Sequence, residues 1–293
     1  MRGPLVAAVL ATVYAVLAQL FDPFLLVCGA IVSLSALRHG DSAALQILVS
    51  VVLAAGSIAF FVTKGFSGYV LLAGALLPLV VLATVLRRTE NQGIALSIAA
   101  LFALGFAAYA RYSVPNVDEY WMRRLQEFND AVEHQGGQFL DAEQLSAVAS
   151  MMHASTILLV MLFLTLSLFL GRWWQASLYN PGGFGTEFRK FVLPKSLMIG
   201  AAAVSLVSLV ALRSNGEIAL IGDMLLLAVI LFAMQGLAVV HHRAHVKEFA
   251  ARPMFVCLYI FLVILPHIFG FLLAIVGIAD NVVDFRRLRS EYS

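Results

Sequence analysis

Long apolar runs separated by short polar connections constrain this chain more than any other feature of its sequence. Residues 43–62, 66–86 and 94–112 each form a run of about 20 predominantly apolar residues. A helix of that length crosses the hydrocarbon core of a bilayer, which is about 30 Å thick. Only 12% of the residues are charged, whereas a soluble domain carries about 25%. The sequence therefore predicts an all-α, polytopic transmembrane helical bundle in contact with the lipid bilayer.

Composition and short motifs argue against several functional classes. The formal net charge of +2 is too small to indicate nucleic-acid binding. Cys28 and Cys257 lie inside apolar runs and form no CxxC pair, which argues against redox or zinc chemistry. The sequence contains no P-loop, GxSxG, HExxH or dinucleotide-binding motif. We therefore expect no enzyme activity, no cofactor and no metal site.

The chain divides into three parts with about eight or nine expected spans. Residues 1–112 hold spans one to five, and residues 151–293 hold spans six to nine together with a cytoplasmic loop at residues 172–195. Residues 113–150, between them, are acidic and break the apolar pattern. We expect this middle segment to be extracytoplasmic and amphipathic.

Two apolar runs allow alternative interpretations. Residues 5–20, preceded by Arg2, form either a signal peptide or a retained helix, and the next run follows so closely that we favour a retained helix. Residues 254–279 contain Pro266 and form either one kinked helix or a hairpin that bends back. Because about 26 residues suit one tilted helix better than two full spans, we favour the kinked helix.

The middle segment contains two local signals. Trp121, Leu125 and Phe128 fall at helical spacing, which predicts an amphipathic helix from residue 117 to 133. This helix is either a solvated cap on the outer surface or a lid over a ligand site. Asp141 and Gln144 have the spacing of a capping box, which predicts that a helix begins there and continues into the sixth span.

The distribution of Lys and Arg predicts the orientation, because cytoplasmic loops are enriched in both. With the N-terminus in the cytoplasm, the basic segments fall inside and the acidic middle segment falls outside. The basic segments are Arg38, Arg87-Arg88, residues 172–195 and residues 241–252. One conflict remains, because nine spans place Arg286, Arg287 and Arg289 outside.

Ionisable and polar side chains at membrane depth are candidate ligand-binding groups. Asp223 either faces a polar crevice near Glu217 or binds a cation or polar ligand, and Gln235 lies further along the same run. His267 is either a neutral, hydrogen-bonded residue or part of a proton relay. A further pair, Asp280 and Asp284, forms either an ion pair with Arg287 or, with Asn281, an oxygen-rich cation site.

Small residues predict a helix face that another helix can approach closely. Ala7, Ala11 and Ala15 recur every four residues in the first run. This stripe either packs within the bundle or serves as a docking face for another membrane protein.

The cytoplasmic loop combines an aromatic anchor, a turn and basic residues. Trp173 and Trp174 are typical of the aromatic belt at a membrane surface. Asn180, Gly182 and Gly183 predict a tight turn, with the basic residues Arg189 and Lys190 following it. The turn either connects two helices only or exposes backbone N–H groups to an anionic headgroup or phosphate. His241 and His245, in the next basic connection, are interpreted as interfacial residues.

Four stretches carry a resemblance to a known family. They are ALRHGDSAAL, RWWQASLYNPGGFGTEFRKFVLPK, QGLAVVHH and GIADNVVDFRRLR. Together they resemble the YybS-like family of bacterial membrane proteins over nearly the whole chain, with NPGGF and DFRR as the more specific parts. The resemblance implies a multi-pass protein of the bacterial inner membrane and carries no mechanism.

The opening spans are distantly similar to the substrate-binding S components of energy-coupling-factor transporters and to the rod-shape protein MreD. The similarity to S components implies that the alanine stripe docks on a coupling subunit and that an extracytoplasmic cavity holds a small ligand. The chain departs from S components in having about three more spans and the acidic middle segment.

Two functions follow as hypotheses. The first is a component for small-molecule or lipid transport, with an unknown ligand in an enclosed polar cavity near Asp223 and His267. The second is a non-catalytic scaffold that recruits envelope or cell-shape proteins, as MreD does. A cavity lined by Asp223, Gln235 and His267 favours transport, whereas a packed interior with an exposed apolar groove favours the scaffold. A lipid-modifying enzyme is disfavoured, because paired catalytic groups are missing from the sequence.

Overall fold

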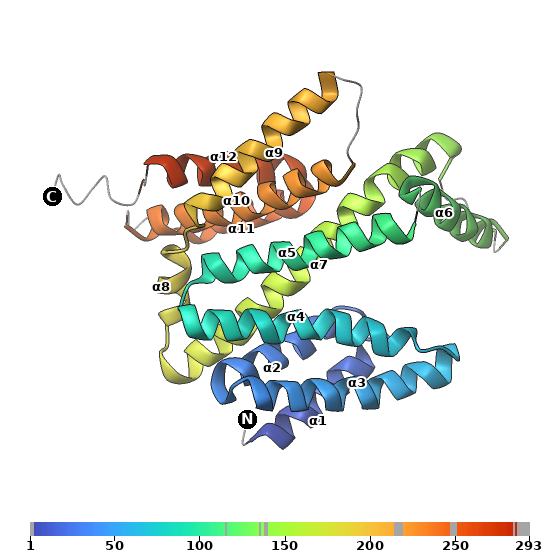
Figure 1. Cartoon of the computed structure of the whole chain (residues 1–293), viewed down its shortest axis with the longest axis horizontal. Helices are drawn as coiled ribbons and strands as arrows, with labels where there is room; N and C mark the ends of the chain where they lie inside the picture. Colours follow the sequence, from blue (N-terminus) through green and yellow to red (C-terminus); the bar gives the residue numbers. More distant parts are fainter. Residues whose placement is uncertain are drawn as a thin grey trace. The chain divides into compact units, whose positions relative to one another are not determined.

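All regular elements among the described residues are α-helices, which confirms the predicted all-α class (Figure 1). The computed structural model describes residues 3–114, 116–134, 136–137, 140–213, 219–246, 251–283 and 285. The helices are α1 (Pro4–Leu17), α2 (Phe24–His39), α3 (Asp41–Thr63), α4 (Ser67–Thr89), α5 (Gln92–Ser113), α6 (Val117–His134), α7 (Ala142–Tyr179), α8 (Gly183–Arg189), α9 (Lys195–Arg213), α10 (Ala219–Val246), α11 (Ala251–Ile264) and α12 (Pro266–Val283).

Six of the described helices are long and apolar enough to cross a membrane. They are α3, α4, α5, α7, α10 and α12. Four others, α1, α2, α9 and α11, are apolar but shorter in their apolar part. The fold is therefore that of a membrane-spanning helical protein.

The chain forms two compact units. Unit 1 contains Met1–Ala99, Leu162–Ile199 and Val229–Ser293, and unit 2 contains Ala100–Met161 and Gly200–Ala228. The long helices α7 and α10 each contribute one part to unit 1 and the other part to unit 2. Each unit has its own set of buried polar contacts, described below.

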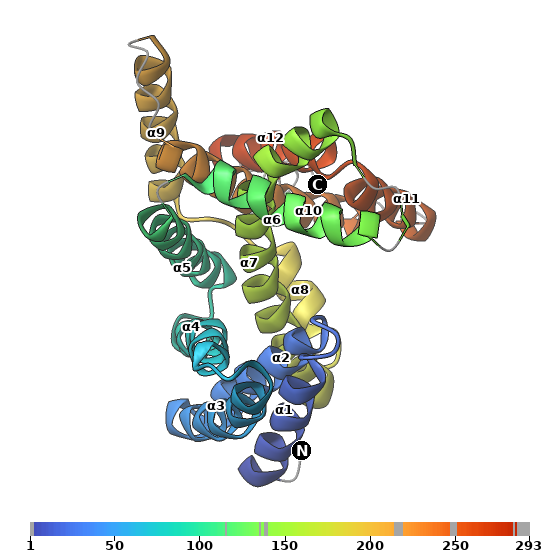
Figure 2. The same cartoon turned by 90° about the vertical axis from the view of Figure 1, so that its right-hand side faces the viewer.

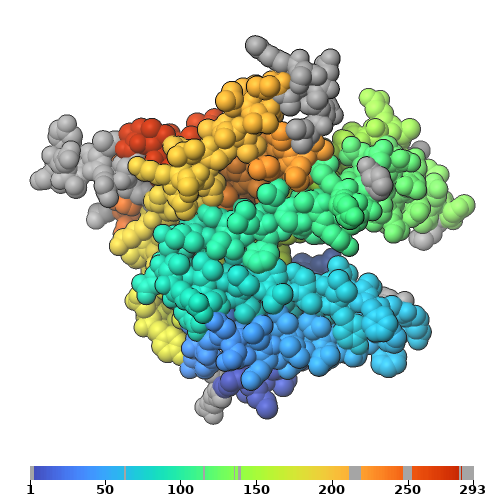
Figure 3. All heavy atoms as spheres, viewed as in Figure 1, coloured from blue at the N-terminus to red at the C-terminus, as the bar shows by residue number. Residues whose placement is uncertain are grey.

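The first four helices pack together within unit 1. Helix α1 contacts α2 and α3, α2 also contacts α4, and α3 pairs with α4 (Figure 2). Figure 3 shows the side chains of α3 and α4 meeting along one face. Ala7, Ala11 and Ala15 are only 2%, 0% and 1% exposed, so the chain itself covers the alanine stripe. The stripe is a packing face, and the hypothesis that a partner docks on it is corrected accordingly.

Connections with unusual backbone angles turn the chain between these helices. Gly40, between α2 and α3, has a φ of 94°, which a side chain rarely adopts. A Cβ atom there would also lie 2.9 Å from Nη1 of Arg87. Glycine at this position therefore lets the chain reverse tightly beside α4.

The last apolar run forms a hairpin and not the single kinked helix that we favoured. The rings of Phe261 and Phe269 stack with centroids 5.0 Å apart and an interplanar angle of 7°. Eight residues along a straight helix would separate them by about 12 Å. Pro266 begins α12, a position that suits proline because the first N–H groups of a helix need no intrahelical acceptor. The chain therefore returns toward the end at which α11 began.

The hairpin returns toward the end of unit 1 at which α10 ends. Nη2 of Arg243, near the end of α10, donates to the carbonyl oxygen of Phe285 at 2.6 Å. Phe285 therefore lies at the same end as the C-terminal part of α10. Asp284 and the three C-terminal arginines fall outside the described residues.

The capping box is confirmed at the start of α7. The N–H of Gln144 donates to Oδ1 of Asp141 at 2.8 Å, and the N–H of Asp141 donates to Oε1 of Gln144 at 3.2 Å. Helix α7 then continues for 38 residues to Tyr179. The expected amphipathic helix is α6 in unit 2, and its role as a cap or a lid stays a prediction.

Candidate functional site

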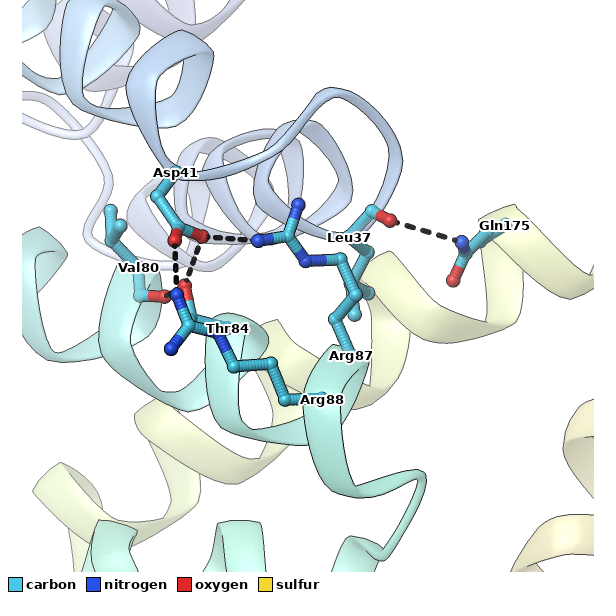
Figure 4. Close-up of polar contacts among 7 residues, drawn as sticks. All are labelled: Leu37, Asp41, Val80, Thr84, Arg87, Arg88 and Gln175. Atoms are coloured by element: carbon cyan, nitrogen blue, oxygen red, sulfur yellow. Dashed lines mark hydrogen bonds and ion pairs between the residues drawn. The ribbon is translucent and has the colours of Figure 1, made fainter.

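One end of unit 1 gathers the segments that we expected on one side of the membrane; it is called the basic end below. Nε2 of Gln175, in α7, donates to the carbonyl oxygen of Leu37 at 3.4 Å (Figure 4). The guanidinium of Arg38 lies 5.3 Å from the ring centroid of Tyr179. These contacts join the end of α2 to the end of α7.

A charge cluster joins α3 to α4 at the basic end (Figure 4). Oδ1 of Asp41 accepts hydrogen bonds from Thr84 at 2.6 Å and Arg87 at 2.7 Å. Oδ2 of Asp41 accepts from Arg88 at 3.1 Å. The acid lies at the N-terminus of α3 and the arginines at the C-terminus of α4, which complements both helix dipoles. Because the Asp41 and Arg87 side chains are 34% exposed, this cluster is a modest clamp between helices.

A second ion pair anchors α8. Arg172 donates from Nε to Oε2 of Glu187 at 2.9 Å and from Nη2 to the other carboxylate oxygen. Nε2 of Gln92, at the start of α5, donates to Oε2 of Glu187 at 3.4 Å. The bidentate geometry restrains both distance and orientation. Glu187 therefore holds α8 against the ends of α7 and α5.

The predicted tight turn connects α7 to α8. The N–H of Gly183 donates to the carbonyl oxygen of Asn180 at 2.9 Å. Gly182 has φ 85° and ψ −10°, the angles of the third residue of a type II turn. A depression of about 520 Å³ beside the turn is lined by Arg189 and Lys190 but also by Glu187. This depression carries both signs of charge, so headgroup binding at the turn stays a prediction.

The two tryptophans lie on α7 and not in a loop. The helix extends to Tyr179, so Trp173 and Trp174 belong to its last turns. Trp173 is 50% exposed and reaches the groove described below. Its position near a helix end agrees with an interfacial aromatic residue.

A buried polar network fixes the segment between α8 and α9. Oε1 of Gln235 accepts from the N–H of Leu193 at 3.0 Å and from Nδ2 of Asn281 at 3.2 Å. Nδ2 of Asn281 also donates to the carbonyl oxygen of Leu193 at 3.0 Å. Nε2 of Gln235 donates to Asp280 at 2.8 Å. Since Leu193 lies outside any helix, these side chains satisfy backbone groups that would otherwise be buried without partners.

The network shows what two of the predicted ligand-binding residues do within the described chain. Gln235 and Asp280 are 0% and 3% exposed and are brought together, as the ligand-binding hypothesis required. Their described contacts, however, are with protein groups that join α10, α12 and the segment at Leu193. The proposed cation site cannot be assembled from described residues, because Asp284 lies outside them.

Asp223 has charged partners within unit 2. Its carboxylate accepts from Nε of Arg111 at 2.5 Å and from Nη2 of Arg111 at 2.8 Å. Nε2 of His153 lies 3.3 Å from Oδ2 of the same carboxylate. Asp223 is 4% exposed, and the paired guanidinium compensates its buried charge.

We did not predict from the sequence that Arg111 and His153 are partners of Asp223. Each stands in or beside an apolar run, and that position was the available signal. His267 lies elsewhere, exposed in the first turn of α12 in unit 1. The expected grouping of Asp223, Gln235 and His267 around one cavity is therefore not formed within either unit, because Asp223 belongs to unit 2 and the other two to unit 1.

A groove of about 1060 Å³ lies within unit 1 between α7, α8, α10 and α11; it is called the α7–α11 groove below. The parts of these helices far from the basic end contribute Leu162, Leu166, Met234 and Leu262. The parts near the basic end contribute aromatic and basic side chains. Those side chains include Trp173, Phe188, Arg189, His241, His245 and Phe255. The groove therefore changes from aliphatic to aromatic and basic along its length.

His241 organises the aromatic wall of the groove. Its ring stacks on Phe255 with centroids 4.3 Å apart and meets Phe188 edge-on at 5.4 Å. Its Nδ1 lies 2.8 Å from the carbonyl oxygen of Leu237, which can only accept, so Nδ1 carries the donated hydrogen. In the neutral ring, Nε2 then accepts from the hydroxyl of Tyr259 at 3.2 Å. Hydrogen bonds thus connect the aromatic wall to both α10 and α11.

Comparison of the chain with models of protein families, with curated proteins and with solved structures finds no match.

Proposed function

We propose that this chain is a multi-pass protein of the bacterial inner membrane that binds a lipid in the α7–α11 groove, as a non-catalytic component of lipid transport. The observation that carries the proposal is the groove itself, which is apolar over most of its lining and has polar groups at one end. A lipid is arranged in the same way, with apolar acyl chains and a polar headgroup at one end.

The length of the groove supports this occupant. Along α7 the lining runs from Leu162 to Trp173, eleven residues apart, which corresponds to about 16 Å of helix. Half of a hydrocarbon core is about 15 Å thick. The groove therefore matches one leaflet, whereas a transmembrane helix of a partner would need a surface about twice as long.

The proposed orientation puts the basic end of unit 1 in the cytoplasm, together with both termini. Lys and Arg are enriched at cytoplasmic ends, and the basic segments meet at this end. With the final hairpin counted as two apolar helices, the described residues contain ten apolar helices, six of them long enough to cross a membrane, and the expected eight or nine spans stay a prediction. Membership in the YybS-like family, suggested by the NPGGF and DFRR stretches, belongs to the same proposal.

The contacts described above bear on both earlier hypotheses, small-molecule transport and the scaffold. A polar small molecule held by Asp223 or Gln235 would have to displace the partners that both residues already contact. The scaffold hypothesis would use the same α7–α11 groove for a partner helix. We favour the lipid because the groove matches one leaflet and becomes basic at one end.

Native mass spectrometry of the protein released from nanodiscs tests the proposal. We expect a retained mass equal to one phospholipid, and we expect Leu166→Trp to lower its occupancy about tenfold by filling the groove. Leu166 is 45% exposed, and Leu159, on the same helix and 63% exposed, provides the control Leu159→Trp because it does not line the groove. Equal occupancy in the two variants would contradict binding in this groove.

A further inference from the structure

We infer that the α7–α11 groove selects an anionic phospholipid of the cytoplasmic leaflet, whose phosphate lies between Arg189 and His245. The inference rests on the proposed lipid-binding function. It adds that the headgroup is anionic and names the residues that bind it. It places the headgroup in the groove, on the α10 side of α8, and not at the turn before α8.

The described residues that line the groove include basic side chains. Among the described residues that line the groove, none is acidic, and the ionisable ones are Arg189, His241, His245 and Tyr259. Glu187, on the same short helix as Arg189, is held by Arg172 and does not line the groove. Among the described lining residues, an anionic headgroup therefore meets the guanidinium of Arg189 and the imidazole of His245.

The basic residues lie where a headgroup would be. Trp173 on α7, His245 on α10 and Phe255 on α11 all come from the parts of their helices nearest the basic end. Tryptophan favours the depth of lipid headgroups. The aliphatic lining begins two to three turns deeper, at Leu166, Met234 and Leu262, where acyl chains would lie.

The contacts that hold α8 in place also set the position of Arg189. Glu187 fixes one side of this helix through Arg172, and Leu193 fixes the chain that follows it through Gln235 and Asn281. Nη2 of Arg189 donates to Thr186 at 3.2 Å, which directs the side chain along α8. The guanidinium is therefore placed before a lipid arrives, which lowers the entropic cost of binding.

Nanodiscs of equal parts phosphatidylcholine and phosphatidylglycerol, with identical acyl chains, provide the test. We expect native mass spectrometry to show phosphatidylglycerol enriched among the retained lipids. Arg189→Gln should reduce the enrichment about fivefold, the factor typical of one basic charge near an anionic surface. Arg189→Gln with His245→Gln should abolish the enrichment while a lipid stays bound.

Lys190→Gln is the matched control, because it removes the same charge from the next residue, which is exposed and does not line the groove. Equal losses of enrichment in Lys190→Gln and Arg189→Gln would assign the effect to general surface charge and overturn the inference. Retained lipid without any enrichment in the unaltered protein would overturn the inference but leave the proposed function standing. Absence of retained lipid, or a co-purified membrane protein displaced by Leu166→Trp, would overturn both.

Discussion

Replacing Gly277 by alanine should force α10 and α12 apart. A Cβ atom at Gly277 would lie 2.0 Å from the carbonyl oxygen of Phe232 and 2.9 Å from the amide nitrogen of Gly236. Both contacts are with backbone atoms, so no side-chain rotation can relieve them. Real Cβ atoms essentially never approach a heavy atom closer than 3.0 Å, so the helices must separate by about 1 Å at this crossing.

The separation also strains the polar network beside the crossing. Gln235 precedes Gly236, and its hydrogen bond to Asp280 measures 2.8 Å, so a shift of about 1 Å exceeds hydrogen-bonding range. Overpacking costs about 1–3 kcal/mol, and one buried hydrogen bond in a membrane protein contributes about 0.6–1.7 kcal/mol. We expect a total loss of about 2–4 kcal/mol in the free energy of unfolding.

Thermal unfolding in one detergent or nanodisc composition measures this loss. Gly270→Ala is the control, because it lies on the same helix and its added Cβ would meet nothing within 4 Å. Gly270→Ala should unfold at the temperature of the unaltered protein or above it, since alanine favours the helix. If Gly277→Ala proves as stable as Gly270→Ala, the close crossing of α10 and α12 is refuted.

Two further variants separate stability from lipid binding. Asp223→Asn should lower the free energy of unfolding by about 3 kcal/mol because it leaves the Arg111 guanidinium without a charged partner. Thermal unfolding measures this loss. The double variant Arg111→Met with Asp223→Leu should recover most of the lost stability. Lipid occupancy should not change in Asp223→Asn, because Asp223 does not line the groove. Glu187→Gln should loosen α8, so that amide hydrogen exchange in Gly183–Arg189 accelerates and lipid occupancy falls, while exchange in α3 stays unchanged. Unchanged exchange in α8 would show that Arg172 and Glu187 do not hold it.

Local sequence signals predicted much of the secondary structure. The apolar run at residues 43–62 became α3, which extends from Asp41 to Thr63. The side chains of Asp141 and Gln144 begin α7 as expected, because a capping box depends only on neighbours in the sequence. Helical length and hydropathy are set by the same residues that form the helix, so tertiary contacts were not needed for these predictions.

The hairpin of α11 and α12 could not be decided from the sequence. Pro266 is compatible with a kinked helix and with the first turn of a new one. The observed arrangement is stabilised by contacts across the sequence, such as the approach of Gly277 to Phe232 and of Asn281 to Leu193. Length alone favoured one helix, and these long-range contacts reversed that preference.

The composition of the groove also could not be predicted from the sequence. Its lining combines Leu166, Phe188, His241 and Tyr259 from four separate helices, and no periodic pattern connects them. The segment at residues 172–195 was identified as a candidate site, and part of it does line the groove. It contributes Trp173 near the end of α7 and the α8 face with Phe188 and Arg189. The turn at Gly182, which the composition had indicated as a candidate site, does not line the groove.

Photocrosslinking with a phospholipid that carries a diazirine on one acyl chain tests lipid binding in the groove most directly. The lipid is incorporated into nanodiscs, activated by light, and mapped by peptide mass spectrometry. Lipid binding in the groove predicts labels concentrated on its aliphatic lining, at Leu162, Leu166, Met234 and Leu262, and reduced there by Leu166→Trp. Labels spread evenly over the exposed apolar residues of all helices, and unchanged in Leu166→Trp, would contradict it.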